Sequence, residues 1–219
     1  MNFGRIYEYR FKDIDQKKKQ LFWNELSAYM YGEHLNKPAR ILDPAGGLCE
    51  FINSVPSQEK WTIDLSEEFL KKNAQKDVKI IIGNNMEVDI PENYFDGIFI
   101  SNFLEHLHTQ EQVALFLERM FKALKPGGRI AIIGPNFKYC YKEYFDFADH
   151  YVILSELGLA EHLYGAGFNL LKIYPKFLPL SFRSGGWLPV NKLTVTSYLK
   201  LPFFWNFLGK QFLVVAEKK

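Results

Sequence analysis

Residues 41–51 read "ILDPAGGLCEF", an apolar run that ends in an acid and then passes through small residues into a predicted helix. Ligands of open α/β sheets bind beyond the carboxyl ends of the strands, so this loop is the expected binding site. A dinucleotide-binding fold would place G-x-G-x-x-G here, and Asp43 would repel a diphosphate at close range. The acid instead favours a cationic ligand, such as an ammonium or sulfonium group. A strand-to-helix turn without any ligand is the structural alternative.

The rest of the chain alternates short apolar runs with helical stretches. The runs that predict buried strands are "ARILD" (39–43), "KWTID" (60–64), "VKIIIGN" (78–84), "FDGIFISN" (95–102) and "GRIAIIGPN" (128–136). Thr109 and Gln112 predict the start of a helix that "KPGG" (125–128) stops, and a second helix is expected from Ser155 to "GAGF" (165–168). Strands that alternate with helices predict an α/β sheet with right-handed crossovers.

Composition indicates an ordinary globular protein. The 219 residues are expected to form a single domain, and a net charge of +2 gives no reason to expect nucleic-acid binding. The two cysteines are too few for a disulfide framework, which suits a reducing compartment. The first residues show no secretory signal, and no run approaches the roughly 18 apolar residues of a membrane span. The protein is therefore expected to be cytoplasmic.

Two segments fall outside the alternation. Residues 1–38 are predicted to form an N-terminal helical cap, and residues 178–207 form an aromatic-rich insertion between two strands predicted at 169–177 and 210–218. The insertion carries Phe182, Trp187, Tyr198, Phe203, Phe204, Trp205 and Phe207. We expect it to pack with residues 1–20 beside the mouth of an acceptor pocket, as a lid that excludes water. A dimer contact or a surface for a lipid-linked acceptor is the alternative, and a monomer and a homodimer both stay open.

Polar residues follow the second and third predicted strands. Asp64 ends the second strand, where an acid can accept hydrogen bonds from both hydroxyls of a ribose. An N-cap of the next helix is the structural alternative for Asp64. "GNNME" (83–87) can offer an amide oxygen to an adenine amino group and Met86 to its face. A nucleoside joined to a cation describes S-adenosylmethionine.

The order of these motifs, together with "LKPGGRIAIIGPN" (124–136) and "GFNLLKI" (167–173), resembles the class I S-adenosylmethionine-dependent methyltransferases. The resemblance spans residues 39–175 and the last strand. It implies a Rossmann-like, doubly wound, mostly parallel seven-stranded sheet with an antiparallel C-terminal strand and helices on both faces. It also implies S-adenosylmethionine as cofactor and S-adenosylhomocysteine as product. The cofactor-binding residues are then Asp43, Ala45, Gly46, Gly47, Cys49, Asp64, Leu65, Asn84, Asn85, Met86, Ser101, Asn102 and Phe103.

The chain departs from the family pattern at two places. Ala45, Gly47 and Cys49 stand where the family usually has three glycines, so two backbone positions lose the freedom to adopt positive φ without strain. Asn84 stands where the family often has Asp, but its carbonyl can still accept a hydrogen bond. We therefore expect cofactor binding to survive.

The family reaction is an SN2 transfer of the sulfonium methyl group, for which an alcohol or ammonium acceptor also needs a base. His106, in "SNFLEHLH" (101–108), is the natural base, and a packing role at a helix start is its alternative. We expect His34, His108 and His162 to be surface or packing histidines.

A divalent metal is a further alternative. The region resembles the ubiquinone-pathway O-methyltransferases and the small-RNA 2′-O-methyltransferases, which have an E-x-x-E-H motif and a later histidine around an ion. The matching catalytic or metal residues here are Glu105, His106 and His150. Asn102 replaces the first Glu, which removes a charge and should weaken metal binding. Metal-free catalysis is the favoured alternative.

The acceptor is expected to be a small molecule such as a sugar, a glycan precursor, a lipid-linked saccharide or a natural product. The aromatic residues predicted to surround it are Tyr139, Tyr141, Tyr144, Phe145 and Phe147. Core and interface packing is the alternative for these rings. A non-catalytic cofactor-binding or regulatory protein on the same fold stays open, as does a nicotinamide-dependent oxidoreductase, which Asp43 and the loop spacing disfavour.

Overall fold

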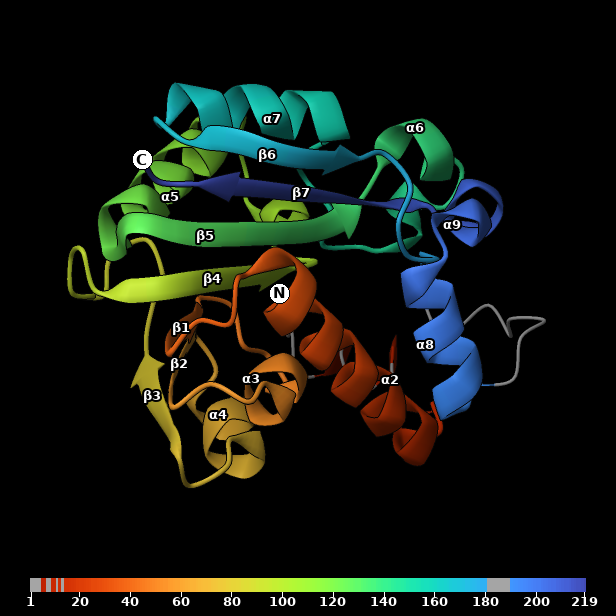
Figure 1. Ribbon diagram of the computed structural model, residues 1–219, viewed down its shortest axis with the longest axis horizontal. Coiled ribbons are helices and arrows are strands. Elements are labelled where there is room, and N and C mark those ends of the chain that lie inside the picture. Colours follow the sequence, from red (N-terminus) through yellow and green to blue (C-terminus); the bar gives the residue numbers. More distant parts are fainter. Residues whose placement is uncertain (1–4, 7–8, 11, 13, 181–189) are drawn as a thin grey trace.

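Seven strands form one sheet in the order β3-β2-β1-β4-β5-β7-β6 (Figure 1). The computed structural model describes residues 5–6, 9–10, 12, 14–180 and 190–219. The strands are β1 (Arg40–Asp43), β2 (Glu59–Asp64), β3 (Val78–Ile82), β4 (Phe95–Ser101), β5 (Leu124–Pro135), β6 (Asn169–Tyr174) and β7 (Gln211–Glu217). β1 to β5 run parallel, and β7 is antiparallel to both β5 and β6. The predicted seven-stranded, mostly parallel sheet with an antiparallel last strand is confirmed.

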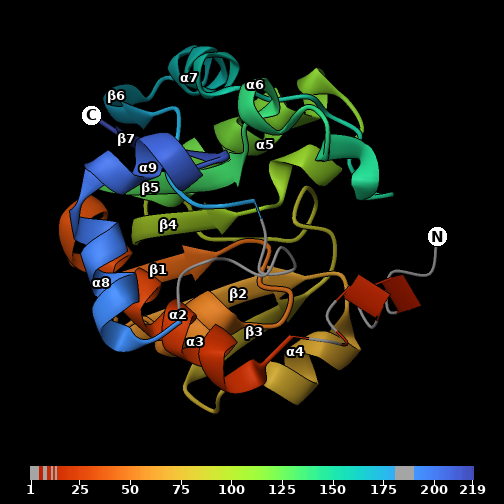
Figure 2. The same cartoon turned by 90° about the vertical axis from the view of Figure 1, so that its right-hand side faces the viewer.

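Helices cover both faces of this sheet, as predicted (Figures 1 and 2). α5 (Gln110–Ala123) and α7 (Glu156–Gly165) bury their apolar side chains against one face, and α2 (Gln16–Tyr29), α3 (Glu50–Ser54) and α8 (Lys192–Lys200) do so against the other. The structure also describes α4 (Glu67–Asn73), α6 (Phe137–Cys140) and α9 (Pro202–Leu208). Strands buried on both faces read as continuous apolar runs, which is why the sequence pattern revealed them.

The predicted helix starts are correct. The Thr109 side chain accepts from the Gln112 N–H at 3.1 Å, and the Ser155 side chain accepts from the Gly158 N–H at 3.2 Å. The end of α5 differs from the prediction, because "KPGG" (125–128) belongs to β5 and the helix has already ended at Ala123. A Cβ on Gly128 would lie 2.9 Å from the Lys125 carbonyl and 3.1 Å from the Phe95 carbonyl, and Gly127 has φ +78°, so both positions favour glycine.

The N-terminal cap and the insertion pack together. α2 continues into a single-turn π-helix, η1 (Met30–His34), and the described part of the insertion forms α8 and α9. The Thr196 hydroxyl donates to Glu25 at 2.8 Å, which joins α8 to α2. Phe182 and Trp187 lie outside the described residues. In the part of the chain that the structure describes, no helix is both long and apolar enough to span a bilayer.

Candidate functional site

The loop after β1 is hydrogen-bonded to the end of β2. The Gly46 N–H donates to the Ile63 carbonyl at 3.0 Å, and the Gly47 N–H donates to the Asp64 carboxylate at 2.9 Å. The Ala45 N–H donates to the Asp43 carboxylate at 3.2 Å. Two acids that are far apart in the sequence therefore lie at one loop, at the carboxyl edge of the sheet.

The small residues of this loop meet different physical demands. A Cβ on Gly46 would lie 1.9 Å from the Thr62 hydroxyl oxygen, so only glycine fits this close approach. Gly47 has φ +49° and Cys49 has φ +60°, both in the left-handed region. Cys49 thus keeps the loop geometry at a cost of order 1–3 kcal/mol in backbone strain. Of the two positions where the family glycine is replaced, Cys49 has the strained positive φ, and Ala45 does not.

Asp43 is a buried carboxyl group near other acids. Its pKa is raised to about 7, mainly by burial; the hydrogen bond from the Ala45 N–H opposes this shift, and the nearby charges of Asp64 and Glu50 add to it. A buried carboxylate is costly unless a cation or hydrogen bonds compensate it. This electrostatic setting suits a ligand that brings a positive charge to Asp43.

Asp64 is held by the backbone on both oxygens. Besides the bond from Gly47, its second oxygen accepts from the Ser66 N–H at 2.8 Å. The N-cap of α4 is Ser66, which accepts from Phe69, so the N-cap alternative for Asp64 is wrong. Each carboxylate oxygen retains another lone pair for a ligand hydroxyl. Leu65, the next residue, is 70% exposed and offers an apolar surface beside it.

The loop after β3 reaches the first loop through a side chain. Asn85 donates from its amide to the Pro44 carbonyl at 3.0 Å. The Asn84 carbonyl oxygen accepts from the Met86 N–H at 3.0 Å, and its amide group donates to Glu87 at 2.9 Å. The two asparagines therefore shape this edge of the site.

The three candidate residues at the end of β4 are Ser101, Asn102 and Phe103, and their side chains make different contacts. Asn102 has φ +49°, and its backbone N–H donates to the Ile133 carbonyl at 2.9 Å. Its side-chain amide donates to the Ser101 hydroxyl at 3.1 Å. The Phe103 ring packs on Phe116, with the two ring centres 5.1 Å apart, so this side chain contributes to the core.

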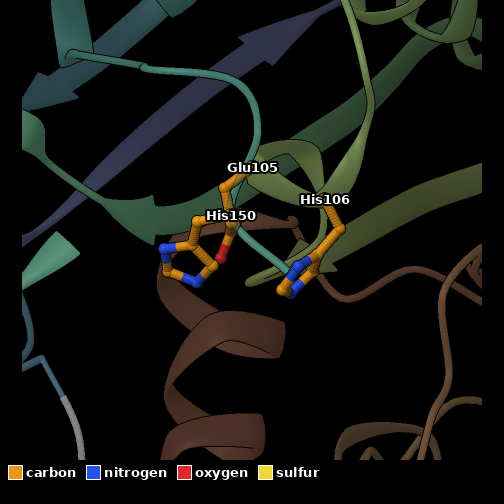
Figure 3. Close-up of side chains that lie close together, drawn as sticks. All are labelled: Glu105, His106 and His150. Atoms are coloured by element: carbon orange, nitrogen blue, oxygen red, sulfur yellow. The ribbon is translucent and has the colours of Figure 1, made fainter. Parts of the chain in front are cut away.

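A second group of polar side chains lies beyond the end of β4. The side chains of Glu105, His106 and His150 converge, and one candidate ligand atom from each lies within 4.8 Å of the others (Figure 3). Glu105 and His106 belong to the 3-10 helix η2 (Leu104–His106), and His150 follows the 3-10 helix η3 (Tyr144–Asp146). The cluster brings together the three residues predicted for catalysis or metal binding, but it does not include Asn102, the other matching position of the metal motif. Asn102 is bonded to Ser101, as described above.

One hydrogen bond determines the tautomer of neutral His106. Its Nδ1 lies 2.7 Å from the Asp149 carbonyl oxygen, and the Asp149 carboxylate is 3.6 Å from the same nitrogen. A carbonyl oxygen can only accept, so Nδ1 carries the proton. The other nitrogen, Nε2, then has a free lone pair that can accept a proton or bind a metal.

His150 and Glu105 are both buried. His150 stacks on Phe147 with ring centres 4.7 Å apart, and burial followed by the nearby charge of His106 lowers the pKa of His150 to about 4. Among the described residues, the Nδ1 atom of His150 has no hydrogen-bond partner. Burial raises the pKa of Glu105, although the nearby His106 opposes that shift. His150 is thus a neutral imidazole at physiological pH.

Arg10 reaches this cluster from the N-terminal segment, and no sequence motif marks it. Its guanidinium forms an ion pair with the buried Asp149 and lies 5.1 Å from the centre of the Phe147 ring. Burial opposes ionisation of Asp149, but the bond from Arg10 and the nearby His106 outweigh burial and lower the pKa of Asp149. The partners are 139 positions apart, so no local pattern could have revealed the pair.

The remaining histidines lie outside the cluster, as predicted. His34 is buried between the rings of Tyr29 and Tyr174, and burial lowers its pKa to about 4. His108 packs edge-on against Tyr151, and His162 is bonded to Gln110 at 2.8 Å.

The aromatic residues expected to surround an acceptor divide into two groups. Tyr144 is fully buried and, like Phe147, contacts the His150 ring. Tyr139, Tyr141 and Phe145 are exposed. Only the first group lies against the polar cluster.

Comparisons with known proteins agree with this architecture. A family model described as a methyltransferase domain matches residues 35–132. The chain is 27% identical over 165 residues to the demethylmenaquinone methyltransferase of Geobacillus sp. (strain WCH70), covering 66% of this chain and 68% of that protein. It is 34% identical over 98 residues to the demethylmenaquinone methyltransferase of Listeria monocytogenes (strain HCC23), covering 39% and 40%. The chain thus spans about two fifths of the Listeria protein's length.

Solved structures match over more of the chain. A SAM-dependent methyltransferase from Archaeoglobus fulgidus superposes with a TM-score of 0.69 at 19% identity, covering 99% of this chain and 100% of that chain. One from Thermotoga maritima gives a TM-score of 0.69 at 16% identity, covering 99% and 96%. At these identities the similarity shows a shared fold.

Proposed function

Because this chain belongs to the class I S-adenosylmethionine-dependent methyltransferases, we propose that it transfers the donor's methyl group to a hydroxyl or amine of a small molecule. The match to methyltransferases speaks against a nicotinamide-dependent oxidoreductase. A non-catalytic cofactor-binding protein on the same fold is the alternative that the turnover assays below test. The observation that carries the proposal is the position of His106, whose Nε2 lone pair is free while Nδ1 donates to the Asp149 carbonyl.

The donor would lie across the loops after β1, β2 and β3. The Asp43 carboxylate would accept from the methionine amine, and its burial supports this role because a cation stabilises the ionised form. Asp64 would accept from the ribose hydroxyls, beside the exposed Leu65. The residues nominated for the adenine end are Asn84, Asn85 and Met86, and those nominated around the methionine and methyl group are Ala45, Gly46, Gly47, Cys49, Ser101, Asn102 and Phe103.

Replacing Asp64 tests the donor assignment. Asp64→Ala is expected to weaken S-adenosylhomocysteine binding by about 1.5–3 kcal/mol, because hydrogen bonds to a charged acceptor are lost. Isothermal titration calorimetry measures the affinity, and Asp89→Ala serves as the control because Asp89 is an exposed acid outside the loop contacts described above. Equal affinities for wild type and Asp64→Ala would refute the ribose role.

Methyl transfer itself needs orientation and a proton acceptor. The sulfonium is already an activated leaving group, so positioning supplies most of the rate. In the proposed reaction His106 Nε2 takes the acceptor's proton as the acceptor atom attacks the methyl carbon, and the methyl–sulfur bond breaks to leave S-adenosylhomocysteine. The Asp149 carbonyl and carboxylate stabilise the imidazolium that forms.

Replacing His106 tests the base. His106→Ala is expected to lower kcat by about 10²–10⁴-fold while S-adenosylhomocysteine affinity stays nearly constant. Acceptors for the assay are sugars, glycan precursors, phenols and quinols; the last class is suggested by the name of the Geobacillus relative. His108→Ala is the matched control, since His108 is exposed and packs on Tyr151. If His106→Ala turns over as fast as wild type, His106 is not the base and its role is packing.

A metal-assisted variant of this reaction is the second candidate, favoured by the convergence of Glu105, His106 and His150. The donor set fits a divalent ion: one carboxylate, the free Nε2 of His106, and a buried His150 whose Nδ1 has no partner among the described residues. A bound ion would polarise the acceptor hydroxyl. Under this alternative a chelator abolishes activity and Mg²⁺ or Mn²⁺ restores it; activity that resists the chelator excludes it.

A further inference from the structure

α9 exposes most of its aromatic side chains. Phe203 is 66% exposed and Phe207 is 71% exposed, whereas Trp205 on the same helix is 2% exposed. The rings of Phe203 and Phe207 lie 5.0 Å apart between their centres, one turn apart on the helix. Leu208, which ends the helix, is also exposed. Several large apolar side chains therefore lie side by side on the exposed face of α9, and such a patch is typical of an interaction surface.

α6 continues this apolar surface. Lys176 donates to the Asn206 carbonyl of α9 at 2.8 Å, and its ammonium lies 4.6 Å from the centre of the Tyr139 ring of α6. Both helices lie at the end of the sheet where the parallel strands finish (Figures 1 and 2). We call this surface the aromatic rim; it comprises Tyr139, Leu201, Phe203, Phe204, Phe207 and Leu208, all of which are exposed.

The segment that contains α8 and α9 carries only positive charges. Residues 162–216 contain five lysines and one arginine but no Asp or Glu, in a chain that has 25 acidic residues among 219. At that frequency about six acids would be expected in these 55 positions. The described cations of the segment are Lys172, Lys176, Lys192, Lys200 and Lys210. Lys176 and Lys200 lie at the aromatic rim itself, the first beneath Tyr139 and the second next to Leu201 in the chain.

We propose that the aromatic rim docks this protein reversibly on an anionic lipid bilayer. Phe203 and Phe207 would enter the boundary between headgroups and acyl chains, and Lys176 and Lys200 would contact lipid phosphates. Charge complementarity selects this occupant: the apolar face of α9 has no acid in its own helix and is bordered by Lys176 and Lys200, which matches an anionic membrane surface. Glu143, which follows α6, is paired with Lys210 and so does not cancel these charges. The short α9 would lie in the interface without crossing the bilayer. The inference does not depend on the methyl acceptor.

Vesicle sedimentation tests the proposal with the full chain. The protein is mixed with vesicles of phosphatidylcholine alone or of phosphatidylcholine and phosphatidylglycerol in equal parts, and the bound fraction is measured. Binding is expected only to the anionic vesicles, with a loss on raising the salt concentration. Phe203→Ser combined with Phe207→Ser is expected to weaken the apparent affinity at least about tenfold. The matched control is Leu115→Ser combined with Tyr164→Ser, which removes two exposed apolar side chains from α5 and α7.

A charge reversal provides the second variant. Lys200→Glu is expected to weaken binding to anionic vesicles, whereas Lys72→Glu, the same charge change on α4, is expected to leave it nearly unchanged. Circular dichroism and S-adenosylhomocysteine titration verify that every variant is folded. The proposal fails if wild type ignores anionic vesicles or if rim and control variants lose binding equally. It also fails if ultracentrifugation shows a dimer that the Phe203 and Phe207 changes dissociate while vesicle binding persists.

Discussion

At the scale of single residues, two buried carboxyl groups differ in pKa because only one of them has a cation as partner. Asp43 is buried beside other acids, which raises its pKa to about 7. Asp149 is buried too, but the ion pair with Arg10 keeps its pKa low. The difference lies in the partner: Asp149 has a cation from its own chain, and Asp43 is expected to receive one from the cofactor.

Asp43 should therefore make donor binding pH-dependent. The free protein holds part of the Asp43 population protonated below pH 7, and a bound ammonium favours the carboxylate, so binding releases a proton. S-adenosylmethionine affinity is expected to rise as the pH increases from 6 to 8, at most about tenfold per pH unit below the pKa. Calorimetry in buffers of different ionisation enthalpy measures the released proton. Asp43→Asn is expected to bind weakly and to lose this pH dependence; a dependence that survives the substitution belongs to another group.

Arg10 should act on turnover through Asp149 and His106. Arg10→Gln leaves the buried Asp149 without its cation, which loosens the acceptor for the His106 Nδ1 proton. The expected result is a fall in kcat of about tenfold or more with little change in donor affinity. Arg10→Lys should recover part of the loss because it restores the charge, while Arg5→Gln, a nearby arginine, is the control. If Arg10→Gln raises KM for the donor at constant kcat, the positioning role is wrong.

At the scale of elements, the insertion is divided between core and surface. The buried aromatic residues of α8 and α9 form hydrogen bonds. The Trp205 indole donates to the Tyr198 carbonyl at 2.7 Å, and the Tyr198 hydroxyl donates to the Phe177 carbonyl. α8 packs on α2 through Leu199 and Val195 in the core of that face. Replacing the whole of 183–205 would therefore remove core residues as well as any lid, so single substitutions separate the two roles better.

Two neighbouring positions on α9 should differ in their effect on stability. Trp205→Ala is expected to lower the free energy of unfolding by about 3–5 kcal/mol, because it removes a fully buried ring and its hydrogen bond. Phe203→Ala, on the exposed side of the same helix, is expected to stay within about 0.5 kcal/mol of wild type. Denaturant unfolding measures both. Similar losses at the two positions would mean that Phe203 is covered in solution.

At the scale of the whole molecule, a buried histidine couples stability to pH. Burial lowers the pKa of His34 to about 4 from its ordinary value of 6.5, so the unfolded chain binds this proton more readily than the folded chain. His34 is expected to lower the free energy of unfolding as pH falls from 6.5 towards 4, by on the order of 2–3 kcal/mol in total. His34→Phe should flatten this part of the pH profile measured by denaturant unfolding. A profile unchanged by the substitution would assign the acid sensitivity to other groups.

The sequence alone determined the layered sheet of this protein and the order of its motifs. Strands such as residues 95–101 are apolar on both faces, and helix starts such as Thr109 carry side chains that cap the backbone locally, so period and capping are visible in a single stretch. For the same reason the cofactor residues were nominated from loops that directly follow those strands. The end of α5 was less exact, because residues 125–128 belong to β5 and the helix already ends at Ala123.

Only the tertiary structure decided which distant groups meet. It brought His150 to Glu105 and His106, placed Arg10 on Asp149 and turned Phe203 outwards while Trp205 turned inwards. These outcomes depend on side-chain burial and on contacts between distant segments, such as the 139 positions between Arg10 and Asp149, which local periodicity does not encode. The sheet could be predicted because its pattern is local; the charges and protonation states of the site could not, because burial determines them and burial arises only when the chain is folded.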